Sequence, residues 1–190
     1  MNEFSELIRS RLYDTPTEHE NMSAPMYITA FTDGSAKPNP GMGGFGYVLY
    51  VDGSQIIGRG AYIAGRTDVT NNEAEYRAII AALQHSKIIR AQHRRPENVS
   101  LIVYLDSELV VKQVSGEYAT NKESLVIMRD RVRKLLEGDW ARLEHVLRHR
   151  NKLANDLANA AVDRQCEVAL NTSIEPTISD VAPKRKHARK

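Results

Sequence analysis

Three carboxylates in this sequence stand at positions that suit the binding of metal ions. Asp33 follows the strand-like run 26–31, and Asp106 is the first charged residue after the apolar run 101–105, so both are expected at strand ends. Glu75 falls on the apolar arc of a predicted helix, where an unpaired carboxylate is costly to bury. Carboxylate oxygens are the ligands that Mg²⁺ and Mn²⁺ prefer. Together the three residues predict a hard-oxygen metal site.

Each carboxylate also has an ordinary structural interpretation. Asp33 begins an Asp-Gly-Ser sequence that is typical of a turn. Asp106 could cap the short helix expected to follow it, and Glu75 could be a hydrogen-bonded buried glutamate. Glu73 falls on the opposite side of the helix, four residues before Arg77, so we expect it to be a solvated residue in an i,i+4 ion pair.

The pattern of apolar residues predicts an α/β fold. Three strands should form an antiparallel meander, and two further strands should alternate with helices, which gives a five-stranded mixed sheet with helices on both faces. A Gly/Pro-rich loop is expected between the first two strands, at residues 34–44, and an Asp-Gly hairpin turn at 52–53. The expected strands are 26–31, 45–51, 55–63, 100–106 and 141–147, and the expected helices are 71–90, a short one from 107, 122–137 and 151–163.

Composition favours one globular domain of ordinary type. The 190 residues include 42% hydrophobic and 26% charged residues, and no apolar run approaches the roughly 20 residues of a membrane span. A single cysteine excludes an internal disulfide, and the N-terminus has no apolar signal region, so we expect a cytoplasmic protein without a membrane partner. We divide the chain into an N-terminal extension (1–25), a domain (26–165) and a basic tail (166–190) that we expect to be disordered.

Charge is nearly balanced, with a formal net value of +2, but it is unevenly distributed. The last seven residues read KRKHARK. Such a segment is typical of a solvated tail, of a nuclear-import signal, or of a tether that contacts nucleic-acid phosphates.

Four motifs, in order along the chain, resemble those of type 1 ribonuclease H. They are residues 27–35 with Asn39-Pro40-Gly41, residues 70–76, residues 105–107, and residues 151–159. The resemblance runs from about Tyr27 to Asp163 and implies a ribonuclease H-like fold. It also implies a monomeric endonuclease that binds RNA–DNA hybrids and hydrolyses their RNA strand by a two-metal mechanism.

The resemblance further implies a set of site residues. Asp33, Glu75, Asp106 and a fourth residue on the last helix would hold two Mg²⁺ or Mn²⁺ ions. Amide side chains would recognise the RNA strand, because an amide can both donate to and accept from a 2′-hydroxyl. The residues expected beside the substrate are Gly34, Asn39, Thr70, Asn71, Asn72, Ser107 and His149.

The fourth position departs from the family pattern. Where an acidic residue is usual, this chain has Asn155, and Asp156 follows it. Helical periodicity leans towards Asn155, so we expect a set of Asp, Glu, Asp and Asn that binds one metal more weakly. The alternative is a small shift of the helix that presents Asp156 instead.

Two loops also depart from the pattern. The loop before the last helix is short, and His149 is its only candidate for helping product leave, although contact with a phosphate or a surface position would suit it equally. Residues 115–121 lead almost directly into the next helix, so the basic protrusion of some relatives is expected to be absent.

Two functions fit these observations. The first is hydrolysis of the RNA strand of hybrids. The alternative is a hybrid-binding module in which Asn155 has cost the protein its catalysis. A related transposase or resolvase nuclease is disfavoured, because those proteins carry their acidic residues in other motifs.

Overall fold

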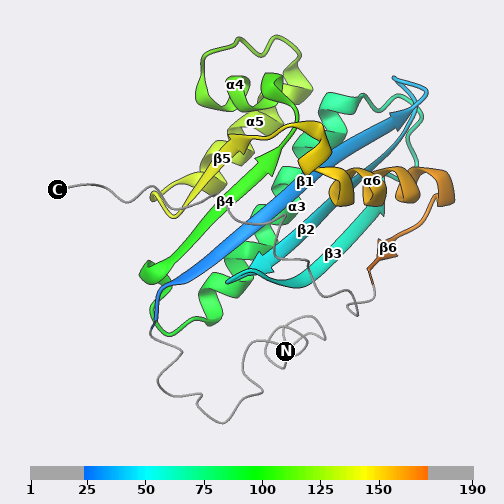
Figure 1. Ribbon diagram of the computed structural model, residues 1–190. Coiled ribbons are helices and arrows are strands. Elements are labelled where there is room, and N and C mark those ends of the chain that lie inside the picture. The colour runs from blue at the N-terminus through cyan, green and yellow to red at the C-terminus, as the bar shows by residue number, and fades with distance from the viewer. Residues whose placement is uncertain (1–23, 171–190) are drawn as a thin grey trace.

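A six-stranded mixed sheet forms the centre of the protein in the computed structural model, which describes residues 24–170 (Figure 1). The strand order is β5-β4-β1-β2-β3-β6. β1, β2 and β3 form the predicted antiparallel meander, and β4 and β5 add to it in parallel. The strands are β1 (Met26–Lys37), β2 (Met42–Val51), β3 (Ser54–Tyr62), β4 (Val99–Leu105), β5 (Ala141–His145) and β6 (Val168–Ala169).

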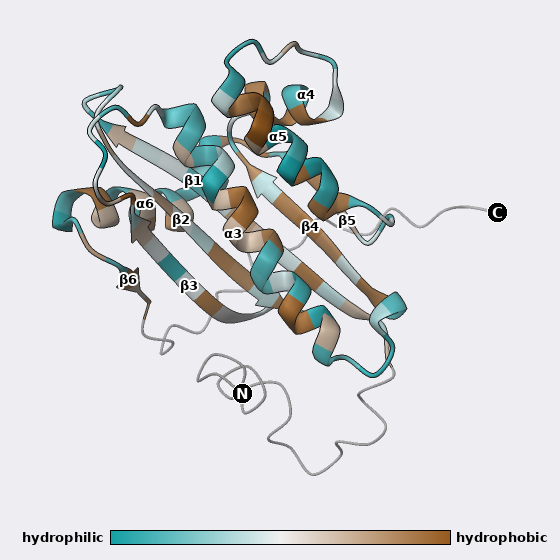
Figure 2. Ribbon diagram, turned by 180° about the vertical axis from the view of Figure 1, so that it is seen from behind, coloured by the Kyte–Doolittle hydropathy of each residue, from teal (hydrophilic) through white to brown (hydrophobic). Residues whose placement is uncertain are grey.

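Helices cover both faces of the sheet, as predicted. The long helix α3 (Asn71–Gln92) packs on one face together with α4 (Glu108–Ser115) and α5 (Glu123–Leu136), and α6 (Lys152–Arg164) packs on the other (Figures 1 and 2). Alternation along β1 divides the core, because Ile28 and Ala30 face the α3 side and Phe31 faces the α6 side. None of the helices within residues 24–170 is long and apolar enough to cross a membrane.

The expected loop at residues 34–44 is largely strand. β1 continues to Lys37 and β2 already begins at Met42, so the glycines here are not turn residues. A Cβ on Gly44 would lie 2.8 Å from Val162 Cγ2 and 3.1 Å from the backbone oxygen of Ala158, so this glycine lets α6 lie close to the sheet. Glycine has no side chain to hold the helix away from the strand. A glycine in such a segment usually indicates a turn, but Gly44 serves helix packing here.

The sixth strand lies beyond the expected end of the domain. β6 pairs with β3 through Arg59↔Ala169 and Gly60↔Val168, so residues 168–169 belong to the sheet rather than to a tail. Two residues give too short a pattern to be recognised as a strand. The rest of the predicted tail, 171–190, and residues 1–23 lie outside the described residues.

Candidate metal centre and substrate surface

Asp33 and Asp106 meet where two parallel strands separate. The last pair of the β1–β4 ladder is Thr32↔Leu105, so the next residues, Asp33 and Asp106, lie side by side at the end of the ladder. On its other side Asp33 still pairs with Gly46 of β2. The prediction that Asp33 ends its strand and enters a turn is therefore wrong. The residue ends only the parallel ladder.

Glu75 reaches the same place from α3, because the helix lies unusually close to β1. A Cβ on Gly34 would be 2.2 Å from the backbone nitrogen of Glu75, so only glycine permits this approach. Ser107 hydrogen-bonds to the Glu75 side chain. Ser107 is also the N-cap residue of α4, so Asp106 is not the helix cap that the sequence allowed.

The three carboxylates repel one another in a poorly hydrated environment. Asp33 is only 6% exposed, and burial, followed by its contacts with Asp106 and the charge of Glu75, raises its pKa to about 8. Burial, with a smaller contribution from Asp106, also raises the pKa of Glu75, whereas the hydrogen bond from Ser107 lowers it. A cation between them would relieve the repulsion.

The fourth predicted position is occupied by an amide that faces Asp33. Asn155 on α6 donates from Nδ2 to Asp33 Oδ2 at 2.9 Å, and its Oδ1 accepts a hydrogen bond of 2.9 Å from Asn159. The alternative residue, Asp156, is exposed and forms a 3.3 Å pair with Lys152. The structure therefore places Asn155, and not Asp156, beside the carboxylates.

One buried residue at the centre was not identified from the sequence as a site residue. Asn151, only 1% exposed, donates from Nδ2 to Asp106 Oδ1 at 2.8 Å and to the backbone oxygen of Thr32 at 2.9 Å. It thus ties the place where β1 and β4 separate to the start of α6. Its position at the start of the fourth motif was the available signal, but no sequence pattern indicated its partners.

The chain atoms offer oxygen ligands to a cation, although they do not form a closed cage. Within residues 24–170, no group of three or more His, Cys, Asp and Glu side chains has the geometry of a metal site. However, Glu75 Oε2 is buried and has no hydrogen-bond partner. A buried carboxylate oxygen without a donor, next to two further carboxylates, fits a divalent cation.

The amides predicted to read the RNA strand cluster at the start of α3. Asn71 Oδ1 accepts a 2.7 Å hydrogen bond from the backbone nitrogen of Ala36, and Asn39 Oδ1 accepts one of 3.2 Å from the backbone nitrogen of Asn71. Asn72 is half-buried on the first turn. Thr70 is the N-cap, and its hydroxyl accepts from the backbone nitrogen of Glu73. These contacts hold the amides of Asn39 and Asn71 beside β1, the strand that carries Asp33.

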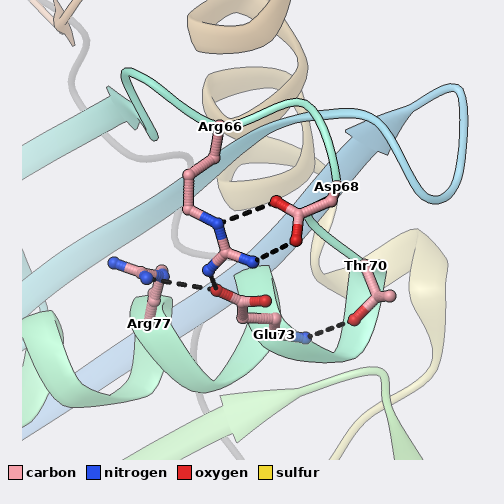
Figure 3. Close-up of polar contacts among 5 residues, drawn as sticks. All are labelled: Arg66, Asp68, Thr70, Glu73 and Arg77. Atoms are coloured by element: carbon pink, nitrogen blue, oxygen red, sulfur yellow. Dashed lines mark hydrogen bonds and ion pairs between the residues drawn. The ribbon is translucent and has the colours of Figure 1, made fainter. Parts of the chain in front are cut away.

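Glu73 stabilises this helix start and is not the solvated residue that we expected. It is 1% exposed and forms ion pairs with Arg77, as predicted, and with Arg66, which was not foreseen (Figure 3). Arg66 also binds Asp68 through two 2.9 Å hydrogen bonds. The Arg77 guanidinium reaches Glu73 along the helix, and the Arg66 guanidinium reaches it because the loop before α3 folds back over the helix (Figure 3). The network therefore fastens the 66–70 loop to the helix.

The remaining predicted substrate residue lies at the surface. His149 is exposed on a short 3-10 turn, Arg148–Arg150, directly before α6. The connection between α4 and α5 is short, because α4 ends at Ser115 and α5 begins at Glu123. Some relatives carry a basic protrusion at this place, and the sequence predicted that this chain lacks it.

Comparison with known proteins identifies related sequences. A family model described as reverse transcriptase-like matches residues 31–161. Ribonuclease HI of Halobacterium salinarum is 39% identical over 138 residues, which cover 72% of this chain and 64% of that protein. A bifunctional protein of Mycobacterium tuberculosis is 33% identical over 147 residues, covering 76% of this chain and 38% of that protein. The chain thus spans less than two thirds of the length of these curated relatives.

Solved structures share the architecture. The crystal structure of RNase H1 from the halophilic archaeon Halobacterium salinarum superposes with a TM-score of 0.63 and 36% identity, over 73% of this chain and 98% of that one. LC11-RNase H1, solved in complex with an RNA/DNA hybrid, gives a TM-score of 0.63 and 29% identity, over 74% of this chain and 98% of that one. These structures confirm the predicted fold.

Proposed function

Because this chain belongs to the type 1 ribonuclease H family, we propose that it hydrolyses the RNA strand of RNA–DNA hybrids at the Asp33, Glu75 and Asp106 cluster. The observation that carries the proposal is the meeting of these carboxylates. They come from β1, α3 and the end of β4, and burial together with their mutual repulsion raises the pKa of Asp33 to about 8. Such a costly arrangement is typical of a functional site.

The cofactor proposed for this site is a pair of Mg²⁺ or Mn²⁺ ions. Asp33, Glu75 and Asp106 would hold the ions, which would supply activation of an attacking water and neutralisation of the charge on the leaving oxygen of a phosphodiester. The protein residues hold the ligands in place: Asn151 orients Asp106, and Ser107 orients Glu75. A cation at this site would lower the pKa of the buried acids, so metal binding would displace the proton that burial and repulsion favour.

Recognition of the RNA strand is proposed for the cluster of amides beside the carboxylates. Asn39, Asn71 and Asn72 lie near the first turn of α3, which is fastened to the sheet through Ala36. A fixed amide that both donates and accepts can distinguish a 2′-hydroxyl from a deoxyribose carbon. A rigid cluster of amides at this edge would therefore favour hybrid over duplex DNA.

A cleavage assay with three substrates tests the function. End-labelled RNA–DNA hybrid, duplex RNA and duplex DNA of one sequence are incubated with the full chain and either Mg²⁺ or Mn²⁺. We expect cleavage of the RNA strand of the hybrid alone, and no cleavage of any substrate by Asp106→Asn.

Asp156→Asn is the matched control, because it removes an exposed acid from the same region without touching the cluster. It should cleave like the parent chain. Equal cutting of all three substrates would refute the proposal. Tight hybrid binding without cleavage at any metal concentration would favour the alternative, a hybrid-binding module.

A further inference from the structure

The orientation of the Asn155 amide is determined by its neighbours. Asn159, one turn further along α6, donates from Nδ2 to the backbone oxygen of Asn155 at 2.9 Å. A backbone carbonyl can only accept, so the Asn159 nitrogen must point this way. The same nitrogen lies 2.9 Å from the Asn155 side chain and donates to it, which requires the Asn155 oxygen at that place.

The Asn155 nitrogen is consequently directed at Asp33. With Oδ1 turned to Asn159, Nδ2 donates to Asp33 Oδ2 at 2.9 Å. Ser35 completes the chain of contacts, since its hydroxyl donates to Asn159 Oδ1 at 2.9 Å. Ser35 lies two residues after Asp33 on β1, so the contacts run from the strand to the helix and back to the same strand.

This arrangement conflicts with the expected role of Asn155 as a metal ligand. A ligating amide must present its oxygen to the cation, because an amide nitrogen has no free electron pair to offer. Rotating the Asn155 amide would place two oxygens against each other at Asp33 and would set the Asn155 nitrogen against the Asn159 nitrogen. Both hydrogen bonds would be lost together.

We propose that Asn155 is a hydrogen-bond donor that orients Asp33, and that Asn159 is the positioning residue that sets the direction of the Asn155 amide. The metal ligands from the protein are then Asp33, Glu75 and Asp106. This inference rests on the proposed function. It changes the role of the fourth position, since the site there supplies a fixed donor in place of a fourth ligand.

Calorimetric titration of Mn²⁺ into the full chain without nucleic acid tests the role of Asn159. Loss of a residue that orients a metal ligand typically weakens metal binding about 10-fold or more. We expect about this loss for Asn155→Ala and for Asn159→Ala, and the same loss for the double variant, because Asn159 acts through Asn155. Asp156→Asn is the control and should bind Mn²⁺ like the parent chain.

Multiplied losses in the double variant would overturn the assignment of Asn159, and so would unchanged Mn²⁺ affinity in Asn159→Ala. A crystal structure of the full chain with Mn²⁺ tests Asn155 directly. We expect carboxylate oxygens of Asp33, Glu75 and Asp106 around the ions, with the Asn155 amide hydrogen-bonded to Asp33. An Asn155 oxygen in the coordination shell would overturn the proposal.

These measurements do not depend on cleavage. A chain that binds Mn²⁺ as described but cuts no hybrid would contradict the proposed function and leave the Asn155 contacts supported. A chain that cuts hybrids while Asn155 ligates Mn²⁺ would do the reverse.

Discussion

The side chain of Asn151 donates a 2.8 Å hydrogen bond to Asp106, and the same nitrogen also donates to the backbone oxygen of Thr32, in the last pair of the parallel β1–β4 ladder. One buried amide thus connects the separating strands to the helix that carries Asn155. The carboxylate geometry consequently depends on a residue that offers no charge of its own.

Replacing Asn151 by alanine should impair both folding stability and catalysis. The change leaves the buried Thr32 oxygen and one Asp106 oxygen without their donor, which costs about 1–3 kcal/mol. Metal affinity and kcat should fall about 10–100-fold. Thermal unfolding and hybrid cleavage measure the two effects, and Asn121→Ala, at an exposed position, should change neither.

Asp33→Asn should stabilise the metal-free protein while abolishing cleavage. The pKa of Asp33 is about 8 in the folded chain against 3.8 for the free residue. Between these pH values the folded chain holds a proton on Asp33 that the unfolded chain has lost, so the free energy of unfolding falls as pH rises from about 4 to 8. The variant removes this loss and should gain about 2 kcal/mol, or about 4–8 °C in Tm, at pH 8. Melting curves in EDTA between pH 4 and 8 check it; a lower Tm for the variant at pH 8 would count against the repulsion.

The acidic cluster was predictable from the sequence because its residues follow apolar runs or fall on an apolar helical face. The strand character of residues 34–44 was not predictable, since Gly34 and Gly44 resemble turn signals but allow close contact with α3 and α6. Glu73 was misjudged for a similar reason. Helical periodicity describes one helix, whereas Arg66 reaches Glu73 from a preceding loop.

The contacts that orient the site side chains were equally inaccessible. Asn151 and Asp106 are 45 residues apart, and Asn155 and Asp33 are 122 apart. Periodicity leaned towards Asn155 over Asp156, but it gave no information on which amide atom faces the carboxylates. That direction depends on Asn159 and on the backbone of α6.

Glu73→Ala should destabilise the start of α3 considerably more than loss of a surface ion pair would. The buried carboxylate pairs with Arg66 and Arg77, and both guanidinium groups remain partly exposed, so we expect a loss of about 1–3 kcal/mol rather than the full cost of a buried pair. Asp156→Ala breaks an exposed pair and should cost about 0.5 kcal/mol or less. Urea unfolding measures both, and equal losses would show that burial of Glu73 contributes little.

His85 should make the protein sensitive to mild acid. Burial, followed by the charge of Arg59, lowers the pKa of His85 to about 4, and the ring nitrogen is hydrogen-bonded to the Tyr47 hydroxyl. The unfolded chain binds a proton near pH 6.5, so stability is full above that pH and is lost as pH falls towards 4. After allowance for partial exposure we expect a loss of about 1–2 kcal/mol. His85→Phe should flatten this part of the pH profile of Tm, and His149→Gln, an exposed control, should leave it unchanged.

Removing residues 184–190 should weaken hybrid binding chiefly at low salt. The segment contains five Lys and Arg residues and lies outside the described residues. Each phosphate contact releases a counterion and adds about 0.9 to the slope of log affinity against log salt concentration, so deletion should reduce the magnitude of that slope by up to about 4.5. The deletion is made in the Asp106→Asn protein, so that the RNA stays intact. Hybrid affinity is then measured between 50 and 300 mM salt, which separates binding from catalysis. A seven-residue Gly-Ser replacement controls for length and should behave like the deletion. An unchanged slope in both variants would mean that the basic segment does not touch the hybrid.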